Sequence, residues 1–157
     1  MRPDLVHYDS PAEYKEHYIR EYCRNEVVTA DGIRIYFKQN KFEHAFYESS
    51  NRDGRKDQFS EYRSQRIDWI KATLESSNAR LKAGWNKKKR CAEHTSRVAV
   101  LLDDFVVIIR MSFRGGKLRG EFVTAYVANN SMEKIESGPN WDRAECIKAL
   151  TKGKLGR

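Results

Sequence analysis

The sequence predicts an α+β fold in which N-terminal helices pack on one face of a mainly antiparallel sheet of four to five strands. Two observations predict it. Amphipathic helical spacing dominates the first half of the chain, and β-branched and aromatic runs joined by short turns follow between residues 79 and 127. Consecutive strands on short turns form an antiparallel meander. With 157 residues we expect one domain: a helical appendage over 1–30, a core over 33–130, and a C-terminal helix with a basic tail over 131–157.

The first predicted helix runs from Ser10 to about Arg24. Ser10 is a suitable cap, Pro11 suits the first helical position, and Glu13 follows the cap by three residues. The face that carries Tyr14, His17, Tyr18, Ile19 and Tyr22 is expected to pack on the body of the protein rather than to meet a partner.

A short strand is predicted over Ile33–Lys38, followed by a helix that starts after Asn40. Phe42 and Phe46 recur at helical spacing and form the buried stripe of that helix. His44 lies two positions beyond Phe42 and therefore points away from this stripe. We expect it to face a groove or solvent.

The next segment, Ser49–Asp57, contains no apolar residue and is predicted to be a loop. From Gln58 to Glu75 apolar residues recur at spacings of three to five, which predicts one long helix. Strands are expected over Ala79–Trp85, over 97–102, over 105–111 and over 120–127. Asp103 and Asp104 form a two-residue hairpin turn. A modest helix over Trp141–Lys152 ends the chain.

Charge indicates the class of partner. Lys and Arg number 30 against 22 acidic residues, which gives a net charge of +8 and a pI near 9.4. Such a balance favours a polyanion, nucleic acid before membrane, because no segment approaches the roughly 20 apolar residues of a membrane helix. A basic protein without a polyanionic partner is the alternative.

Three widely spaced cysteines and an N-terminus without an apolar signal core predict a reducing, cytoplasmic setting. Cys91 and His94 have a ligand-like spacing, but no second Cys or His pair lies nearby in the sequence. We expect no metal and no other cofactor.

Four segments together carry a resemblance: FEHAFYES, RIDWIKATLES, RVAVLLDDFVVIIRMS and GEFVTAYVANN. In this order they resemble the phage-associated, toxin-like ribonuclease families of the barnase, EndoU, colicin and RelE-like fold. The resemblance covers roughly residues 33–130 and consists of layout and short motifs. The N-terminal helix and the loop over 49–57 have no counterpart that we can assign.

The resemblance implies an active groove built from His44 and Arg66 on helices and from Thr124 and Tyr126 on the last strand. Thr124 and Tyr126 are two residues apart and so share one face of a strand. Arg110 joins them from the neighbouring strand. Further RNA contacts are expected from basic side chains near the groove and in the loop after residue 86: Lys38, Lys41, Arg63, Lys87, Lys88, Lys89 and Arg90.

The implied activity is metal-independent cleavage of RNA by attack of the 2′-hydroxyl, which leaves 2′,3′-cyclic phosphate ends. His44 has the intrinsic pKa for proton transfer, and arginines suit the phosphate. An acidic antitoxin or immunity protein is a further candidate partner.

The main alternative is a non-catalytic module that binds nucleic acid through the basic stretches 52–56, 87–90 and 114–119. Other enzyme classes lack their motifs here, because the sequence has no glycine-rich phosphate loop, zinc deaminase signature or GxSxG elbow. Asp103 and Asp104 are explained as a turn rather than as magnesium ligands.

Overall fold

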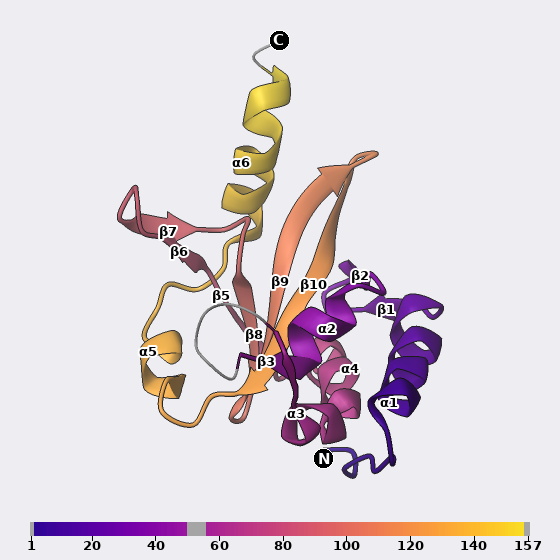
Figure 1. Ribbon diagram of the computed structural model, residues 1–157. Coiled ribbons are helices and arrows are strands. Elements are labelled where there is room, and N and C mark those ends of the chain that lie inside the picture. Colours follow the sequence, from indigo (N-terminus) through magenta and orange to yellow (C-terminus); the bar gives the residue numbers. More distant parts are fainter. Residues whose placement is uncertain (1, 50–55, 156–157) are drawn as a thin grey trace.

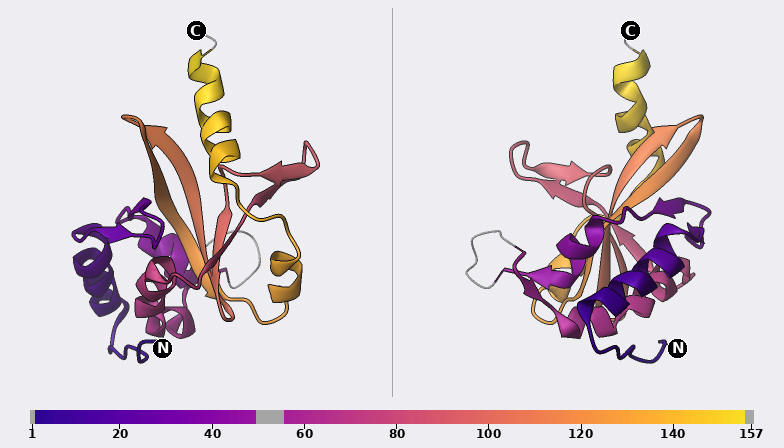
Figure 2. Two further views of the ribbon diagram at one scale, coloured as in Figure 1. Left: turned by 180° about the vertical axis from the view of Figure 1, so that it is seen from behind. Right: turned by 45° about the vertical axis from the view of Figure 1, so that its right-hand side comes forward.

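The computed structural model describes residues 2–49 and 56–155. A twisted sheet stands at its centre, with helices α1 to α4 gathered on one side and α6 projecting beyond one end (Figure 1). Two further views show α5 and the β6–β7 hairpin on the other side of the sheet (Figure 2). The predicted α+β class is therefore confirmed.

The sheet has six strands in the order β1-β2-β10-β9-β8-β5. Their bounds are Val27–Val28 (β1), Arg34–Tyr36 (β2), Arg80–Lys82 (β5), Val98–Leu102 (β8), Phe105–Arg114 (β9) and Lys117–Val127 (β10). Every pair of neighbouring strands is antiparallel except the pair β2 and β10, which is parallel. The expectation of four to five antiparallel strands is thus wrong, because β2 adds to β10 across a long stretch of sequence and β1 extends that edge.

Two hairpins join β8, β9 and β10, and the predicted turn at Asp103 and Asp104 is the first of them. Asp103 and Asp104 connect β8 to β9, with Asp103 in the left-handed region at φ 53°. Gly115 and Gly116 connect β9 to β10 with φ of 58° and 75°, values that glycine adopts without steric cost.

The first helix is α1 (Pro11–Tyr18), which continues as a π-helical turn η1 (Ile19–Cys23). Ser10 caps it by accepting a hydrogen bond from the Glu13 amide at 3.4 Å. Tyr14, Tyr18 and Tyr22 are almost fully buried in the main core. The predicted packing of this aromatic face is confirmed, and the segment described above as an appendage contributes centrally to the core.

The predicted long helix over 58–75 is interrupted. Gln58–Phe59 forms β4 and pairs with β3 (Tyr47–Glu48), while α3 (Glu61–Gln65) and α4 (Ile67–Glu75) are separated at Arg66. The Ser60 amide donates to the Phe46 carbonyl at 2.8 Å, and its hydroxyl caps α3. Residues 58–60 therefore pair with the end of α2 (Lys41–Phe46) and the residues just after it, although periodicity alone would place them in a helix.

The strand expected over 79–85 is also divided. After β5, the segment Gly84–Asn86 (β6) leaves the main sheet and pairs with Cys91–Glu93 (β7). Two helices complete the chain, α5 (Met132–Glu136) and α6 (Arg143–Leu155), the second close to the predicted C-terminal helix. Most of the loop predicted over 49–57 lies outside the described residues.

Two apolar clusters lie on the two faces of the sheet. The inner face carries Val107, Ile109 and Met111 of β9 and packs against α1, α2 and α4. The outer face carries Val106 and Ile108, which pack with Tyr126 and with Met132 and Ile135 of α5. Over the described ranges, no helix combines the length and apolar character needed to cross a membrane.

Candidate functional site

A β-bulge in β10 decides which side chains reach the outer face. Phe122 pairs with Ile109 and Thr124 with Ile108, so Val123 is one extra residue in the ladder. Tyr126 then pairs with Val106. Since Ile108 and Val106 belong to the outer face, Thr124 and Tyr126 lie there too, away from the face that packs against α1 and α4.

His44 comes from α2, which packs against β10 beyond the point where β2 ends (Figure 1). Phe42, Ala45 and Phe46 bury one side of this short helix in the main core. His44 lies on its other side and is exposed. The prediction that it avoids the core is therefore confirmed.

The environment of His44 is electropositive. Desolvation lowers the pKa of His44 below its ordinary value, and the positive charges of Lys41, Lys56, Arg97 and Arg63 lower it further. The free imidazole is therefore neutral at pH 7 and has a lone pair available for a proton.

Tyr126 lies in the field of two of the same cations. Burial raises the pKa of Tyr126 above its ordinary value, although Arg97 and Arg63 act in the opposite direction. The phenol is protonated at neutral pH and can donate a hydrogen bond. Arg63 and Arg97 thus lower the pKa of both a helix histidine and a strand tyrosine.

Arg63 is fixed by the end of α2. Its guanidinium donates to the Ala45 carbonyl at 3.3 Å and lies 3.4 Å from a carboxylate oxygen of Glu48. These contacts hold α3 against α2, so the charge next to His44 is positioned by the fold.

Arg97 is held by an unusual backbone. It is exposed and has φ 53°, a left-handed conformation that non-glycine residues adopt infrequently. Gly84 lies against this turn, and a Cβ at Gly84 would approach the Ser96 carbonyl oxygen to 2.3 Å. Only glycine fits there, so β6 and the Arg97 turn are fixed together.

A cavity of about 730 Å³ opens beside Arg97 and Tyr126 on the outer face. Four cations and no carboxylate line it, and the exposed ring of Trp85 stands at its edge. The cationic side chains are Lys82, Lys87, Arg97 and Lys134. Such a basic hollow next to an aromatic ring suits a phosphodiester with an adjacent base.

Arg66, expected in the groove, makes its contacts elsewhere. Its guanidinium stacks on Tyr62 at 3.6 Å from the ring centroid and donates to the Tyr62 carbonyl at 2.7 Å. It also lies 5.1 Å from the Trp69 ring. Arg63, one turn earlier, is the α3 cation that, like Arg97, acts on both His44 and Tyr126.

Arg110 and Lys38 converge on one carboxylate. Arg110 donates to Glu121 at 3.0 Å, and the Lys38 ammonium lies 3.2 Å from the same residue. Burial raises the pKa of Glu121, but the two cations outweigh it and hold that pKa below its ordinary value. Arg110 is thus on the outer face as predicted, with its charge balanced by Glu121.

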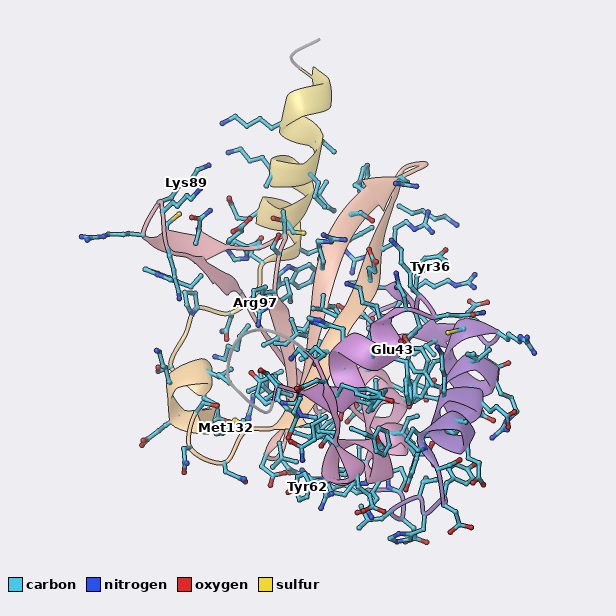
Figure 3. All side chains as sticks on the ribbon, viewed as in Figure 1. Tyr36, Glu43, Tyr62, Lys89, Arg97 and Met132 are labelled. Carbon is cyan, nitrogen blue, oxygen red and sulfur yellow. The ribbon has the colours of Figure 1, made fainter. Side chains whose placement is uncertain are left out.

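The basic loop residues lie at a distance from this group. Lys88 and Lys89 donate their amides to the Asn86 side chain in the turn of the β6–β7 hairpin, which extends away from the sheet (Figure 3). Lys87 alone of the predicted loop cations lines the cavity.

Arg97, Glu121 and Trp85 were not predicted as site residues. The sequence offers one signal for Arg97, a basic residue directly before an apolar strand. Its left-handed backbone and the bulge at Val123 depend on tertiary contacts and leave no local pattern.

Within the described ranges, no three His, Cys, Asp or Glu side chains gather into a group that could hold a metal ion. Comparisons with protein-family models, with curated proteins and with solved structures found no match.

Proposed function

We propose that this protein binds single-stranded RNA on the outer face and cleaves it through attack of a 2′-hydroxyl on the adjacent phosphate. The observation that supports the proposal is the cationic cavity lined by Arg97 and Tyr126, together with the action of Arg63 and Arg97 on the pKa values of His44 and Tyr126. A proton acceptor, a hydrogen-bond donor and two fixed positive charges are what this reaction requires.

Each group has a role in the proposed step. Neutral His44 takes the proton of the 2′-hydroxyl as the 2′-oxygen forms its bond to phosphorus. The bond from phosphorus to the 5′-oxygen breaks, and that oxygen takes a proton from water. Arg63 and Arg97 offset the charge that gathers on the phosphorane, while Tyr126 and Thr124 donate hydrogen bonds to its oxygens.

The test is incubation of the purified protein with RNA in EDTA, followed by analysis of the ends. We expect 2′,3′-cyclic phosphate and 5′-hydroxyl ends, and a rate that falls by roughly 100-fold or more in His44→Ala. The exposed position of His44 predicts an unchanged melting temperature for this variant.

Lys71→Gln is the matched control, because it removes a charge on α4 at the helical side of the sheet. It should cleave like the wild type. Ends with 3′-hydroxyl and 5′-phosphate that appear only with magnesium would contradict the proposal, and so would a fully active His44→Ala protein.

The second candidate is a binding module without catalysis. The exposed Trp85 ring at the edge of the cationic cavity favours it, because stacking on an aromatic ring holds a base without chemistry. RNA that is bound but remains intact in this assay would favour this candidate. An acidic protein partner of the antitoxin or immunity type would compete for the same basic surface in either case.

A further inference from the structure

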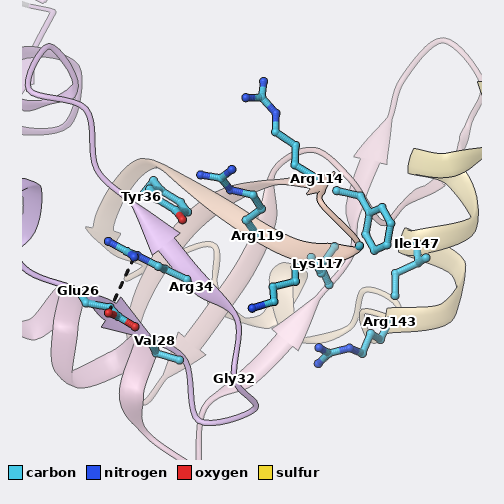
Figure 4. A pocket seen from close by; sticks show the side chains of 13 residues that line it. Glu26, Val28, Gly32, Arg34, Tyr36, Arg114, Lys117, Arg119, Arg143 and Ile147 are labelled. Carbon is cyan, nitrogen blue, oxygen red and sulfur yellow. Dashed lines mark ion pairs between the residues drawn. The ribbon is translucent and has the colours of Figure 1, made fainter. Parts of the chain in front are cut away.

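A second basic hollow lies near the other end of β10. It has a volume of about 560 Å³ and is formed where β2, the β9–β10 hairpin and α6 meet (Figure 4). Five cations and one carboxylate line it. The cations are Arg34, Arg114, Lys117, Arg119 and Arg143.

Two of these cations oppose each other directly. Arg34 of β2 is the register partner of Arg119 of β10, and like charges at such positions destabilise a sheet. Both guanidinium groups also lie over the ring of Tyr36, at 4.7 Å and 4.0 Å from its centroid. Two cations thus lie against one ring.

Acidic residues offset only part of this charge. Arg34 lies 3.9 Å from Glu26, and Arg143 lies 3.8 Å from Asp31, both long distances for ion pairs between exposed side chains. Across residues 2–49 and 56–155, Arg119 and Lys117 have no ion pair with an acidic side chain. The hollow therefore suits an anion rather than a ring.

The paired arginines share the outer face with the candidate site. Arg119 and Glu121 are two residues apart on β10, and Glu121 pairs with Arg110 of β9. Arg110 is two residues from Ile108, the partner of Thr124. Arg119, Glu121, Thr124 and Tyr126 therefore form one row along β10.

The row has a length that a short strand of RNA spans. Arg119 and Tyr126 pair with Ser112 and Val106, which are six positions apart on β9 because Val123 is bulged, so the row is roughly 20 Å long. Glu121 lies between the two ends, where its negative charge would repel a phosphate. Arg110 and Lys38 neutralise it, so the row carries no unbalanced negative charge.

We propose that this hollow binds phosphates of the same single-stranded RNA, remote from the phosphate that reacts beside His44. This inference rests on the proposed function and adds a second contact region to it. Long strands should reach both regions, whereas a strand of about four nucleotides at the candidate site should not reach Arg34 and Arg119.

The experiment measures affinity for 2′-O-methyl RNA, which lacks the attacking hydroxyl and stays intact. Strands of about 4 and about 16 nucleotides are titrated at several salt concentrations against wild type, Arg34→Gln, Arg119→Gln and Lys71→Gln. For the long strand, each arginine variant should lower the salt slope by about 0.7 and weaken binding on the order of fivefold at 0.1 M salt. The short strand should bind all four proteins alike.

Removal of one member of a like-charge pair should not unfold the protein, which melting temperatures check. Lys117→Gln provides a third variant outside that pair and should also weaken only the long strand. The inference is overturned if both lengths lose affinity equally, or if the arginine variants bind the long strand like Lys71→Gln.

The two proposals can fail separately. If the arginine variants lose affinity for the long strand only and natural RNA stays intact, the second contact region is supported and the nuclease proposal is refuted. If cleavage depends on His44 but the arginine variants show no length-dependent loss of affinity, the nuclease proposal is supported and the second contact region is refuted. If the wild type binds neither the short nor the long strand, both proposals are refuted.

Discussion

At the scale of single residues, the candidate site depends on how Arg97 is held. Its side chain lines the larger cavity and acts on both His44 and Tyr126. Its left-handed backbone lies against Gly84, where a side chain would meet the Ser96 carbonyl oxygen. A strained backbone beside a cluster of titratable groups is where function is to be sought.

Arg97→Gln should raise the pKa of His44 and the pKa of Tyr126 together, because one positive charge that lowers both is removed. NMR titration of the imidazole and of the phenol measures the two values. Lys71→Gln is the control and should shift neither. A change in only one of the two pKa values would show that Arg97 does not link them.

The sign of the pH effect on stability follows from the same shift. The folded pKa of His44 lies below its unfolded value, so the unfolded chain binds more protons. The contribution of His44 to stability is therefore full above its unfolded pKa of about 6.5, and it is lost as the pH falls from there through the lower pKa of the folded state. His44→Ala removes this part of the pH dependence.

At the scale of elements, strand β10 carries both the core and the site. Its bulge at Val123 turns Thr124 and Tyr126 to the outer face while Phe122 and Ala125 stay in the main core. If Val123 took an ordinary place in the ladder, the strict alternation of a strand would put Thr124 and Tyr126 on the inner face, opposite to that of Glu121.

Deletion of Val123 should therefore leave a regular ladder in which Thr124 and Tyr126 keep their partners Ile108 and Val106 and stay on the outer face. Cleavage should be retained, and stability in urea unfolding should fall by no more than about 1–3 kcal/mol for the loss of one half-buried side chain and the local change of twist. Val123→Ala keeps the bulge and is the control. A deletion variant that folds but no longer cleaves RNA would contradict the assigned register.

The pairing of β2 with β10 depends on Gly120. A Cβ at this position would lie 2.6 Å from Cδ1 of Ile35, the residue paired with it. Gly120→Ala should cost about 1–3 kcal/mol by overpacking. Ile35→Val removes Cδ1 and should recover part of that loss, so a double-mutant cycle should yield a favourable coupling energy. Strictly additive costs would contradict the contact.

At the scale of the whole molecule, the sequence predicted what is local. β8, β9 and β10 were expected because short turns join adjacent apolar runs, and α1 because Ser10, Pro11 and Glu13 mark its start. The parallel pairing of β2 with β10 was not expected, because no pattern near Arg34 indicates Arg119. The strand at residues 58 and 59 was missed for the same reason, since β4 pairs with β3, which lies outside the periodic segment.

The candidate site divides in the same way. His44 and the shared strand face of Thr124 and Tyr126 follow from spacing along one element. By contrast, it depends on how separate elements pack that Arg63 rather than Arg66 acts on His44. The same holds for Arg97, which is the residue before β8.

The distribution of charge predicts stabilisation by anions. Millimolar pyrophosphate should raise the melting temperature by a few degrees, because it binds the folded basic hollows and not the unfolded chain. Thermal unfolding of Arg97→Gln and Arg119→Gln should show smaller increases, and that of Lys71→Gln the full one. Equal increases in all four proteins would indicate a general salt effect.

The parallel pairing of β2 with β10 also sets an order of events during synthesis. Strand β2 and the helix α2 that follows it, which carries His44, are synthesised early. However, β2 has no neighbour on the β10 side until the chain has extended to Glu121. Contacts of such long sequence separation form late in folding. The proposed site needs Thr124 and Tyr126 of β10 together with His44, so a growing or truncated chain that lacks this strand cannot form it.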